Sequence, residues 1–170
     1  MTYIYFVPTP ETIEELKALY RKLALKHHPD LGGDTETMKT VNSEYDSLFV
    51  EVKTFRRNSK GEVYEKETEE APEHFKDIID ALIKLNMEKV EVELIGCFLW
   101  LSGNTKPYKN EIKELGFKWS KNKSSWYLAP DDYRKRSRKD YSMNDIRSMY
   151  GSKNVNTDRT EETSFVAISV

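Results

Sequence analysis

One stretch near the N-terminus concentrates side chains that could do chemistry: KHHPDLGGD, residues 26–34. It places two imidazoles beside a proline and a carboxylate, followed by a pair of glycines. Such a set could bind a metal ion, form a catalytic pair, or present a surface to another protein. Which of these it does depends on the elements that position His28, Pro29 and Asp30.

The spacing argues against metal binding and catalysis. Histidine ligands usually stand at i and i+3 or i+4 on one helical face, whereas His27 and His28 are adjacent. His74 is the only other histidine in the chain. A base made of His28 and Asp30 would need a nucleophile or oxyanion donors nearby, and the neighbouring sequence offers none. We therefore expect no metal, no cofactor and no catalytic residue, and a plain helix end followed by a turn remains an alternative.

The segment before the stretch is predicted to be a helix. From Ile13 the apolar residues recur at i, i+3, i+4, i+7 and i+8, which is the spacing of one helical face. Thr12 and Glu15 offer a capping box at the start of this helix. Pro29 disfavours the α conformation at His28, so the helix should end just before it.

The predicted helix also carries basic residues away from its apolar face. This basic stripe consists of Lys17, Arg21, Lys22 and Lys26. Beyond the loop, Asp34 can cap a second helix to about residue 52, because the apolar residues again keep helical spacing. The expected result is a pair of antiparallel helices joined at their tips, with His28 in an exposed turn.

The sequence YRKLALKHHPDLGGD, ahead of a second helix containing VNSEYDSL, resembles the J-domain of the DnaJ co-chaperone family. That family carries a histidine-proline-aspartate tripeptide between two antiparallel helices, matched here by His28, Pro29 and Asp30. It also carries a tyrosine-arginine-lysine-leucine-alanine run on the preceding helix, matched by residues 20–24. The resemblance covers residues 10–55. The family's short first helix, basic fourth helix, glycine-phenylalanine-rich region and zinc-binding cysteine repeat have no counterpart.

The resemblance implies docking on a DnaK-type ATPase chaperone, of the heat-shock protein 70 class, and stimulation of its ATP hydrolysis. The hydrolytic residues would then belong to the partner, so we expect a co-chaperone and not an enzyme. The chaperone-binding residues that the resemblance implies are His28, Pro29, Asp30, Lys17, Tyr20, Arg21, Lys22 and Lys26.

Charge divides the rest of the chain. The 27 basic and 29 acidic residues nearly cancel overall. Yet residues 61–93 hold 11 acidic and 4 basic side chains, whereas residues 103–139 hold 11 basic and 4 acidic ones. The single cysteine excludes an internal disulfide, and we find no signal peptide and no long apolar run. We expect a cytoplasmic protein without membrane contact.

We predict an α+β protein made of four segments. An N-terminal antiparallel helical hairpin, J-domain-like, spans residues 1–58, and an acidic linker spans 59–72. A small α/β domain with a short antiparallel sheet follows at 73–130, and its amphipathic helix starts at about Pro72. Residues 131–170 hold a basic segment, a short helix and a polar tail. The C-terminal domain is expected to select an unknown client protein or complex.

The alternative function is binding of single-stranded nucleic acid. GFKWSKNKSSWYLAP interleaves lysines with aromatics, and this region more weakly resembles a tryptophan-rich module of DNA-handling proteins. The chain would then belong to a phage or mobile element, with the J-like hairpin as a scaffold. The candidate residues are Lys118, Lys121, Lys123, Tyr127, Arg134, Lys135 and Arg136.

The same aromatic residues could instead form the core of a small domain. Neighbouring residues on a strand face opposite sides of its sheet, so Trp126 and Tyr127 cannot both point into a one-sided core. We expect Trp126 to be buried against the helix containing Ile112 and Leu115. Tyr127 should then lie outside, among Lys118, Lys121 and Lys123.

Overall fold

A computed structural model describes residues 3–130, 133–134, 140–150 and 152–155. The two helices predicted around the loop are confirmed as α1 (Ile13–His27) and α2 (Thr35–Val52). The Thr12 side chain accepts a hydrogen bond from the backbone N–H of Glu15, and Asp34 accepts one from Thr37 at 2.7 Å. These caps satisfy amide groups that have no partner inside the helix, which fixes where each helix begins. A short 3-10 turn, η1 (Pro29–Leu31), joins α1 to α2, and together the three elements form the helical hairpin.

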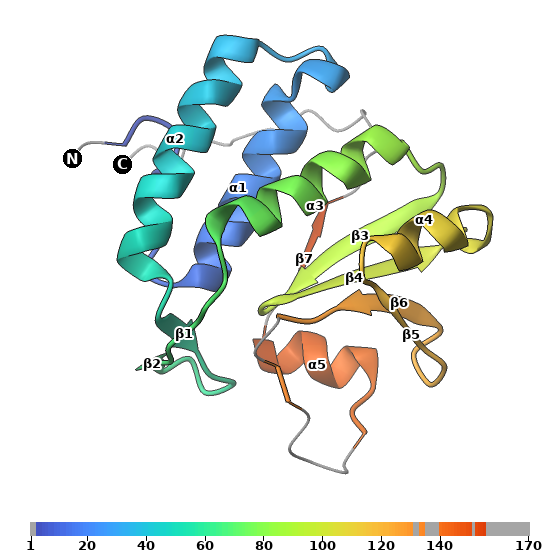
Figure 1. Ribbon diagram of the computed structural model, residues 1–170. Helices are drawn as coiled ribbons and strands as arrows, with labels where there is room; N and C mark the ends of the chain where they lie inside the picture. The colour runs from blue at the N-terminus through green and yellow to red at the C-terminus, as the bar shows by residue number, and fades with distance from the viewer. Residues whose placement is uncertain (1–2, 131–132, 135–139, 151, 156–170) are drawn as a thin grey trace, which may run out of the picture.

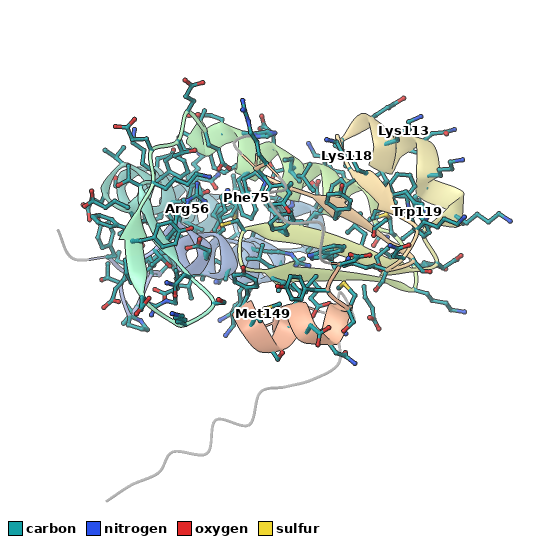
Figure 2. The ribbon with its side chains drawn as sticks, turned by 90° about the horizontal axis from the view of Figure 1, so that it is seen from below. Arg56, Phe75, Lys113, Lys118, Trp119 and Met149 are labelled. Carbon is teal, nitrogen blue, oxygen red and sulfur yellow. The ribbon has the colours of Figure 1, made fainter. Side chains whose placement is uncertain are left out.

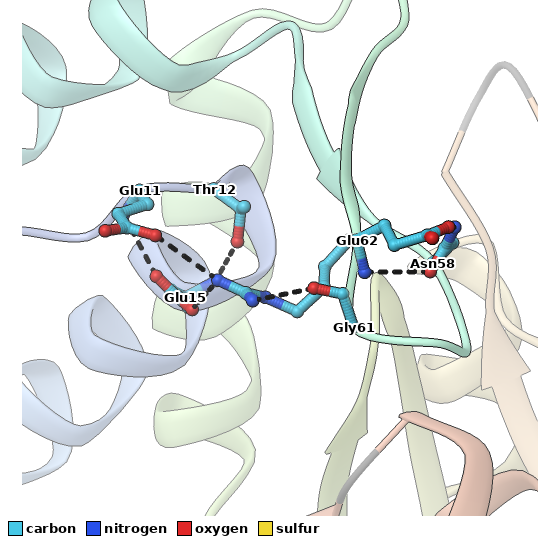
Figure 3. Close-up of polar contacts among 7 residues, drawn as sticks. Glu11, Thr12, Glu15, Asn58, Gly61 and Glu62 are labelled. Carbon is cyan, nitrogen blue, oxygen red and sulfur yellow. Dashed lines mark hydrogen bonds and ion pairs between the residues drawn. The ribbon is translucent and has the colours of Figure 1, made fainter.

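The expected acidic linker contains regular structure. Strands β1 (Phe55–Arg57) and β2 (Val63–Glu65) pair as a small antiparallel hairpin, so the expectation of a bare linker at 59–72 is wrong in this part. The Asn58 side-chain oxygen holds the turn by accepting backbone N–H groups, and the guanidinium of Arg57 reaches both the carbonyl oxygen of Gly61 and the carboxylate of Glu15 (Figure 3). This ties the hairpin of strands to the start of α1.

The second half of the chain forms a five-stranded antiparallel sheet with α3 (Pro72–Leu85) before it (Figure 1). The strand order is β5-β6-β4-β3-β7, and the α+β class is confirmed. The strands are β3 (Val90–Ile95), β4 (Phe98–Gly103), β5 (Lys118–Ser120), β6 (Ser125–Leu128) and β7 (Ser152–Val155). The remaining elements are η2 (Lys106–Tyr108), α4 (Lys109–Glu114) and α5 (Met143–Tyr150).

Strand β7 corrects the expectation for the C-terminal segment. Residues 152–155 were expected to be part of a polar tail, but they pair with β3, with Val155 opposite Val92. They add an edge strand, where backbone hydrogen bonds hold the segment and little apolar surface is required. Of the basic cluster RKRSRK expected at residues 134–139, only Arg134 lies within the described residues.

The two faces of the sheet differ because successive side chains on a strand alternate. One face buries Val92, Leu94, Leu99, Leu101 and Trp126 in the core. Helix α4 lies on one side of the sheet and α5 on the other (Figure 1). The core is continuous from the sheet through α3 into the hairpin, across the boundary expected at 59–72.

Candidate functional site

The conformation of the loop between α1 and α2 is held by hydrogen bonds of His28 and by two glycines. The Nδ1 atom of His28 accepts the backbone N–H of Asp30 at 3.2 Å, and the carbonyl oxygen of His28 accepts the N–H of Gly33 at 2.9 Å. Gly32 adopts a left-handed conformation with φ of 84°. A Cβ atom at Gly33 would lie 2.1 Å from the carbonyl oxygen of His27, so only glycine fits this position. The two glycines are therefore structural parts of the loop.

The loop presents two of its three motif residues to solvent. Pro29 and Asp30 are exposed at the tip of the hairpin. On α1, Lys26 is exposed and lines one groove with Asp30, and Lys22 is exposed one turn earlier on the same helical face. These four residues form one open surface, which we call the exposed tip. Its carboxylate and two ammonium groups are free of the desolvation that burial would impose.

The other half of the predicted site is covered. Lys17, Tyr20, Arg21 and His28 are all buried, which corrects the expectation that Lys17 and Arg21 form a solvent-facing stripe. Lys17 and Arg21 are each 3% exposed. The cover is α3, which contacts α1, η1 and α2. We call these four residues the covered surface.

Lys17 is buried together with a charge partner. Its ammonium group forms an ion pair with the carboxylate of Glu70, which is also buried, and its Nζ atom lies 5.1 Å from the ring centroid of Phe75. A carboxylate and an aromatic face together stabilise an ammonium group that has left water. The segment before α3 and α3 itself therefore supply the partners of this basic residue.

His28 is 7% exposed, so the expectation that it lies in an exposed turn is wrong. Its Nε2 atom lies 3.3 Å from Oδ1 of Asp80 on α3. Because Nδ1 accepts the Asp30 N–H, Nε2 is the nitrogen that carries the proton in the neutral ring. The imidazole thus connects the loop to α3.

Tyr20 and Arg21 complete the covered surface. The Tyr20 hydroxyl donates to Oδ1 of Asn42 at 2.9 Å, and its ring meets Phe75 edge to face at 6.2 Å between centroids. Burial, and then the neighbouring charge of Asp80, raises the pKa of the Tyr20 hydroxyl above its ordinary value. Burial lowers the pKa of the Arg21 guanidinium to about 10. Both shifts reflect removal from water, of Tyr20 by α2 and α3 together and of Arg21 beside α3.

A groove runs beside the covered surface, between the end of α1 and α3. Its apolar lining comes from Leu25, Leu31, Ile79, Leu82, Ile83 and Met87, and its charged lining includes Arg21, Lys26 and Asp30. The groove therefore continues from the exposed tip to the edge of the cover.

Sequence reasoning missed Glu70 and Asp80 as partners of the site. The signal was present in the charge pattern, because the acidic excess of residues 61–93 complements the basic stripe of α1. Glu70 falls in the linker predicted at 59–72 and Asp80 on the helix predicted after it, and neither assignment relates these residues to α1.

The predicted nucleic-acid residues are only partly brought together. Lys118, Lys121 and Arg134 are exposed, whereas Lys123 pairs with Asp140 at 2.9 Å. Lys135 and Arg136 lie outside the described residues. Lys118 stands opposite Tyr127 in the strand register.

The aromatic residues of β5 and β6 differ in burial according to the face of the sheet and the strand on which they lie. Trp126 is 7% exposed and shares the core with Ile112 and Leu115, which confirms its predicted burial. Tyr127 is half-buried, with its ring 5.4 Å from that of Trp100, so it is less open than expected. Trp119, which was not among the predicted site residues, is 48% exposed (Figure 2). Its ring meets Trp126 edge to face at 5.4 Å, because the two residues are partners across β5 and β6.

Among the residues that the structure describes, no group of three or more histidine, cysteine, aspartate or glutamate side chains is placed to hold a metal ion. Within those same residues, no helix combines the length and apolar character needed to span a membrane.

Comparisons with known proteins give short, local matches. The chain is 44% identical over 43 residues to the small t antigen of budgerigar fledgling disease virus, covering 25% of this chain and 30% of that protein. It is 48% identical over 42 residues to chaperone protein dnaJ A6 of Oryza sativa subsp. japonica, covering 25% of this chain and 10% of that protein. It is 51% identical over 37 residues to DnaJ protein homolog 2 of Allium porrum, covering 22% of this chain and 9% of that protein.

The chain therefore spans less than a third of the length of these relatives. No family model matches the chain. No solved structure matches it either. The matches to DnaJ proteins support the J-domain resemblance of the N-terminal part and do not extend over the rest of the chain.

Proposed function

We propose that the chain is a J-domain co-chaperone that docks on a DnaK-type chaperone and stimulates its ATP hydrolysis. The observation that carries this proposal is the exposed tip. It places Pro29 and Asp30 at the end of an antiparallel helical hairpin, beside Lys22 and Lys26 on α1. The local similarity to DnaJ proteins supports the same function.

Each residue of the loop has a role in this proposal that follows from its chemistry. Pro29 fixes the backbone, so the Asp30 carboxylate can pair with a cation of the partner at little ordering cost. His28 is a positioning residue, because its Nδ1 atom holds the backbone N–H of Asp30. Lys22 and Lys26 attract an acidic partner surface and raise the rate of association. Hydrolysis itself takes place on residues of the chaperone, so the chain needs no catalytic group or cofactor.

The second half of the chain would direct this activity to a client. In this proposal the five-stranded sheet and its helices select the client protein or complex, and the protein works in the cytoplasm. The proposal does not specify the client.

A binding measurement with Asp30→Asn tests the proposal. We expect the parent protein, immobilised on a sensor surface, to bind the ATP-bound chaperone, and the Asp30→Asn variant to lose most of this affinity. Asp30 is exposed, so the substitution should leave the fold intact. Glu111→Gln, an exposed neutralisation on α4, is the matched control. Equal binding by parent, Asp30→Asn and control would contradict the proposal.

Single-stranded nucleic acid is a second candidate ligand, because an aromatic residue is exposed on a strand that also carries a lysine. Trp119 is exposed on the edge strand β5 (Figure 2), and Lys118, its neighbour on the strand, is exposed as well. Bases stack on exposed aromatic rings while lysines meet the phosphates. A fluorescence titration with a short single-stranded oligonucleotide at low salt tests this candidate. Unchanged fluorescence and anisotropy with tens of micromolar oligonucleotide would exclude single-stranded nucleic acid as a ligand.

A further inference from the structure

Helix α3 occupies half of the surface that the proposed function assigns to the chaperone. Lys17, Tyr20, Arg21 and His28 cannot touch a second protein while α3 lies on them. Two of the contacts that hold α3 there, Glu70 with Lys17 and Asp80 with His28, place acidic groups against basic ones, which is the same chemistry expected of an acidic partner. The covered surface therefore already has an occupant within the chain.

The contact between α3 and the helical hairpin combines polar pairs with aromatic packing that belongs to the continuous core. Glu70 pairs with Lys17, Asp80 lies 3.3 Å from His28, and Lys76 pairs with Asp46 at 2.6 Å. Phe75 adds the aromatic part of the contact against Tyr20 and Tyr45, with centroid distances of 6.2 and 6.4 Å. The polar pairs are the part of this contact that charge-neutralising substitutions can weaken while the apolar surface stays unchanged.

A further polar cluster lies where the hairpin meets the sheet. The Cys97 thiol, in the turn between β3 and β4, donates to Oε1 of Glu14 at 2.9 Å and accepts from Nη1 of Arg56 at 3.1 Å. Arg56 belongs to β1, at the hairpin side of the molecule (Figure 2). This contact also joins the hairpin to the sheet through polar atoms.

The contact between α3 and the sheet is apolar. Ile78 faces Leu99 and Leu128 around one small cavity. Leu82 and Ile83 face Val90 and Val92 along the groove described above. Apolar surface of this kind is costly to separate in water, so α3 should stay with the sheet. We call α3 and the five-stranded sheet together the α3–sheet unit.

We propose that the α3–sheet unit is a built-in cap that competes with the chaperone for the covered surface of α1. The inference rests on the proposed function and concerns its regulation. Among the described residues the chain crosses from hairpin to cap at 66–71, a segment without helix or strand that can act as the hinge. In the closed state the chaperone meets only the exposed tip. Opening adds Lys17, Tyr20, Arg21 and His28 to the surface it can bind.

The cap lowers the apparent affinity for the chaperone, because only the fraction of molecules that is open can bind with the full surface. A ligand that needs a minor state binds with a dissociation constant divided by the population of that state. Substitutions that weaken only the closed contact should therefore tighten chaperone binding, although they replace none of the residues that bind the chaperone. An increase in affinity is the opposite of the effect expected from a substitution that damages a docking site.

The test combines Glu70→Gln with Asp80→Asn, and its matched control combines Glu73→Gln with Asp77→Asn. Both pairs neutralise two carboxylates on or just before α3. Glu70 and Asp80 face the hairpin, whereas Glu73 and Asp77 are exposed. We expect the first pair to bind the ATP-bound chaperone at least about fivefold more tightly than the parent, and the control pair to stay within about twofold of the parent.

Cys97 reports opening without the chaperone. Opening separates the thiol from Glu14 and Arg56, so its alkylation, followed by mass spectrometry of the Cys97 peptide, should be faster in Glu70→Gln/Asp80→Asn than in the parent or the control pair. If labelling and affinity are the same in all three proteins while parent binding still depends on Asp30, the cap is wrong and the proposed function stands. If the parent and both double variants fail to bind the chaperone, the proposed function is wrong, and so is the proposed competition between the cap and the chaperone.

Discussion

The Nε2 atom of His28 lies 3.3 Å from Oδ1 of Asp80, while Nδ1 of the same ring accepts the backbone N–H of Asp30 at 3.2 Å. One imidazole therefore holds the loop on one side and α3 on the other. The residue that positions Asp30 in the proposed function is therefore also part of the contact that closes the molecule. This relationship makes His28 a structural residue as well as a positioning residue.

Replacing His28 with Gln should lower stability. Glutamine cannot reproduce both contacts of the ring, and a lost buried hydrogen bond costs about 1 kcal/mol. For a chain of this size we expect the melting temperature to fall by about 2–4 °C, measured by circular dichroism. His74→Gln is the control, because His74 is exposed. A variant that melts with the parent would show that the ring is not held as described.

Reversing the two exposed lysines should slow docking. Lys22→Glu with Lys26→Glu changes the charge of the exposed tip while leaving the buried Lys17 and Arg21 in place. We expect slower association with the chaperone and a flatter dependence of the association rate on salt. Lys39→Glu with Lys53→Glu, on or just after α2, is the control for net charge. Identical rates for both double variants would locate the contact elsewhere.

The two tryptophans paired across β5 and β6 should respond in opposite ways. Trp126 is buried, so Trp126→Ala should cost about 3–5 kcal/mol of unfolding free energy. Trp119 is half-exposed at the sheet edge, so Trp119→Ala should cost much less, about 1 kcal/mol. Urea denaturation measures both values. Similar losses at the two positions would contradict the assignment of one ring to the core and the other to the surface.

Stability should fall at alkaline pH, in part because of Cys97. Burial, and then the charge of Glu14, raises the pKa of the Cys97 thiol from 9.0 to about 12. Between these values the unfolded thiol is ionised and the folded one is neutral, so the stabilisation is complete below pH 9 and is lost as pH rises toward 12. Urea midpoints of parent and Cys97→Ala between pH 8 and 10.5 measure this dependence. The decline should be shallower in Cys97→Ala, and parallel curves would assign it to other groups.

The sequence predicts the helical hairpin well because the apolar spacing and the caps agree. Thr12 and Asp34 start the two helices where the pattern begins, and Pro29 follows the end of α1. The alternation at Trp126 and Tyr127 likewise predicts which ring enters the core. In these cases the local sequence preferences agree with the packing of the folded protein.

Other features depend on long-range contacts that no local pattern contains. Lys17 and Arg21 belong to residue types that are rarely buried, and only the placement of α3 removes them from water. Strand β7 is held by pairing with β3, more than 50 residues earlier in the chain. The burial of His28 has the same origin, because its cover comes from Asp80 on α3.

Single-turnover ATP hydrolysis by a DnaK-type chaperone tests the central claim most directly. The chaperone is loaded with ATP, mixed with excess parent protein or with Asp30→Asn, and the rate of hydrolysis is compared with that of the chaperone alone. The account predicts a clear acceleration by the parent, a larger one by Glu70→Gln/Asp80→Asn at subsaturating concentration, and none by Asp30→Asn. A parent protein that leaves the rate unchanged even with the cap contact weakened, or an Asp30→Asn variant that accelerates it as well as the parent does, would contradict it.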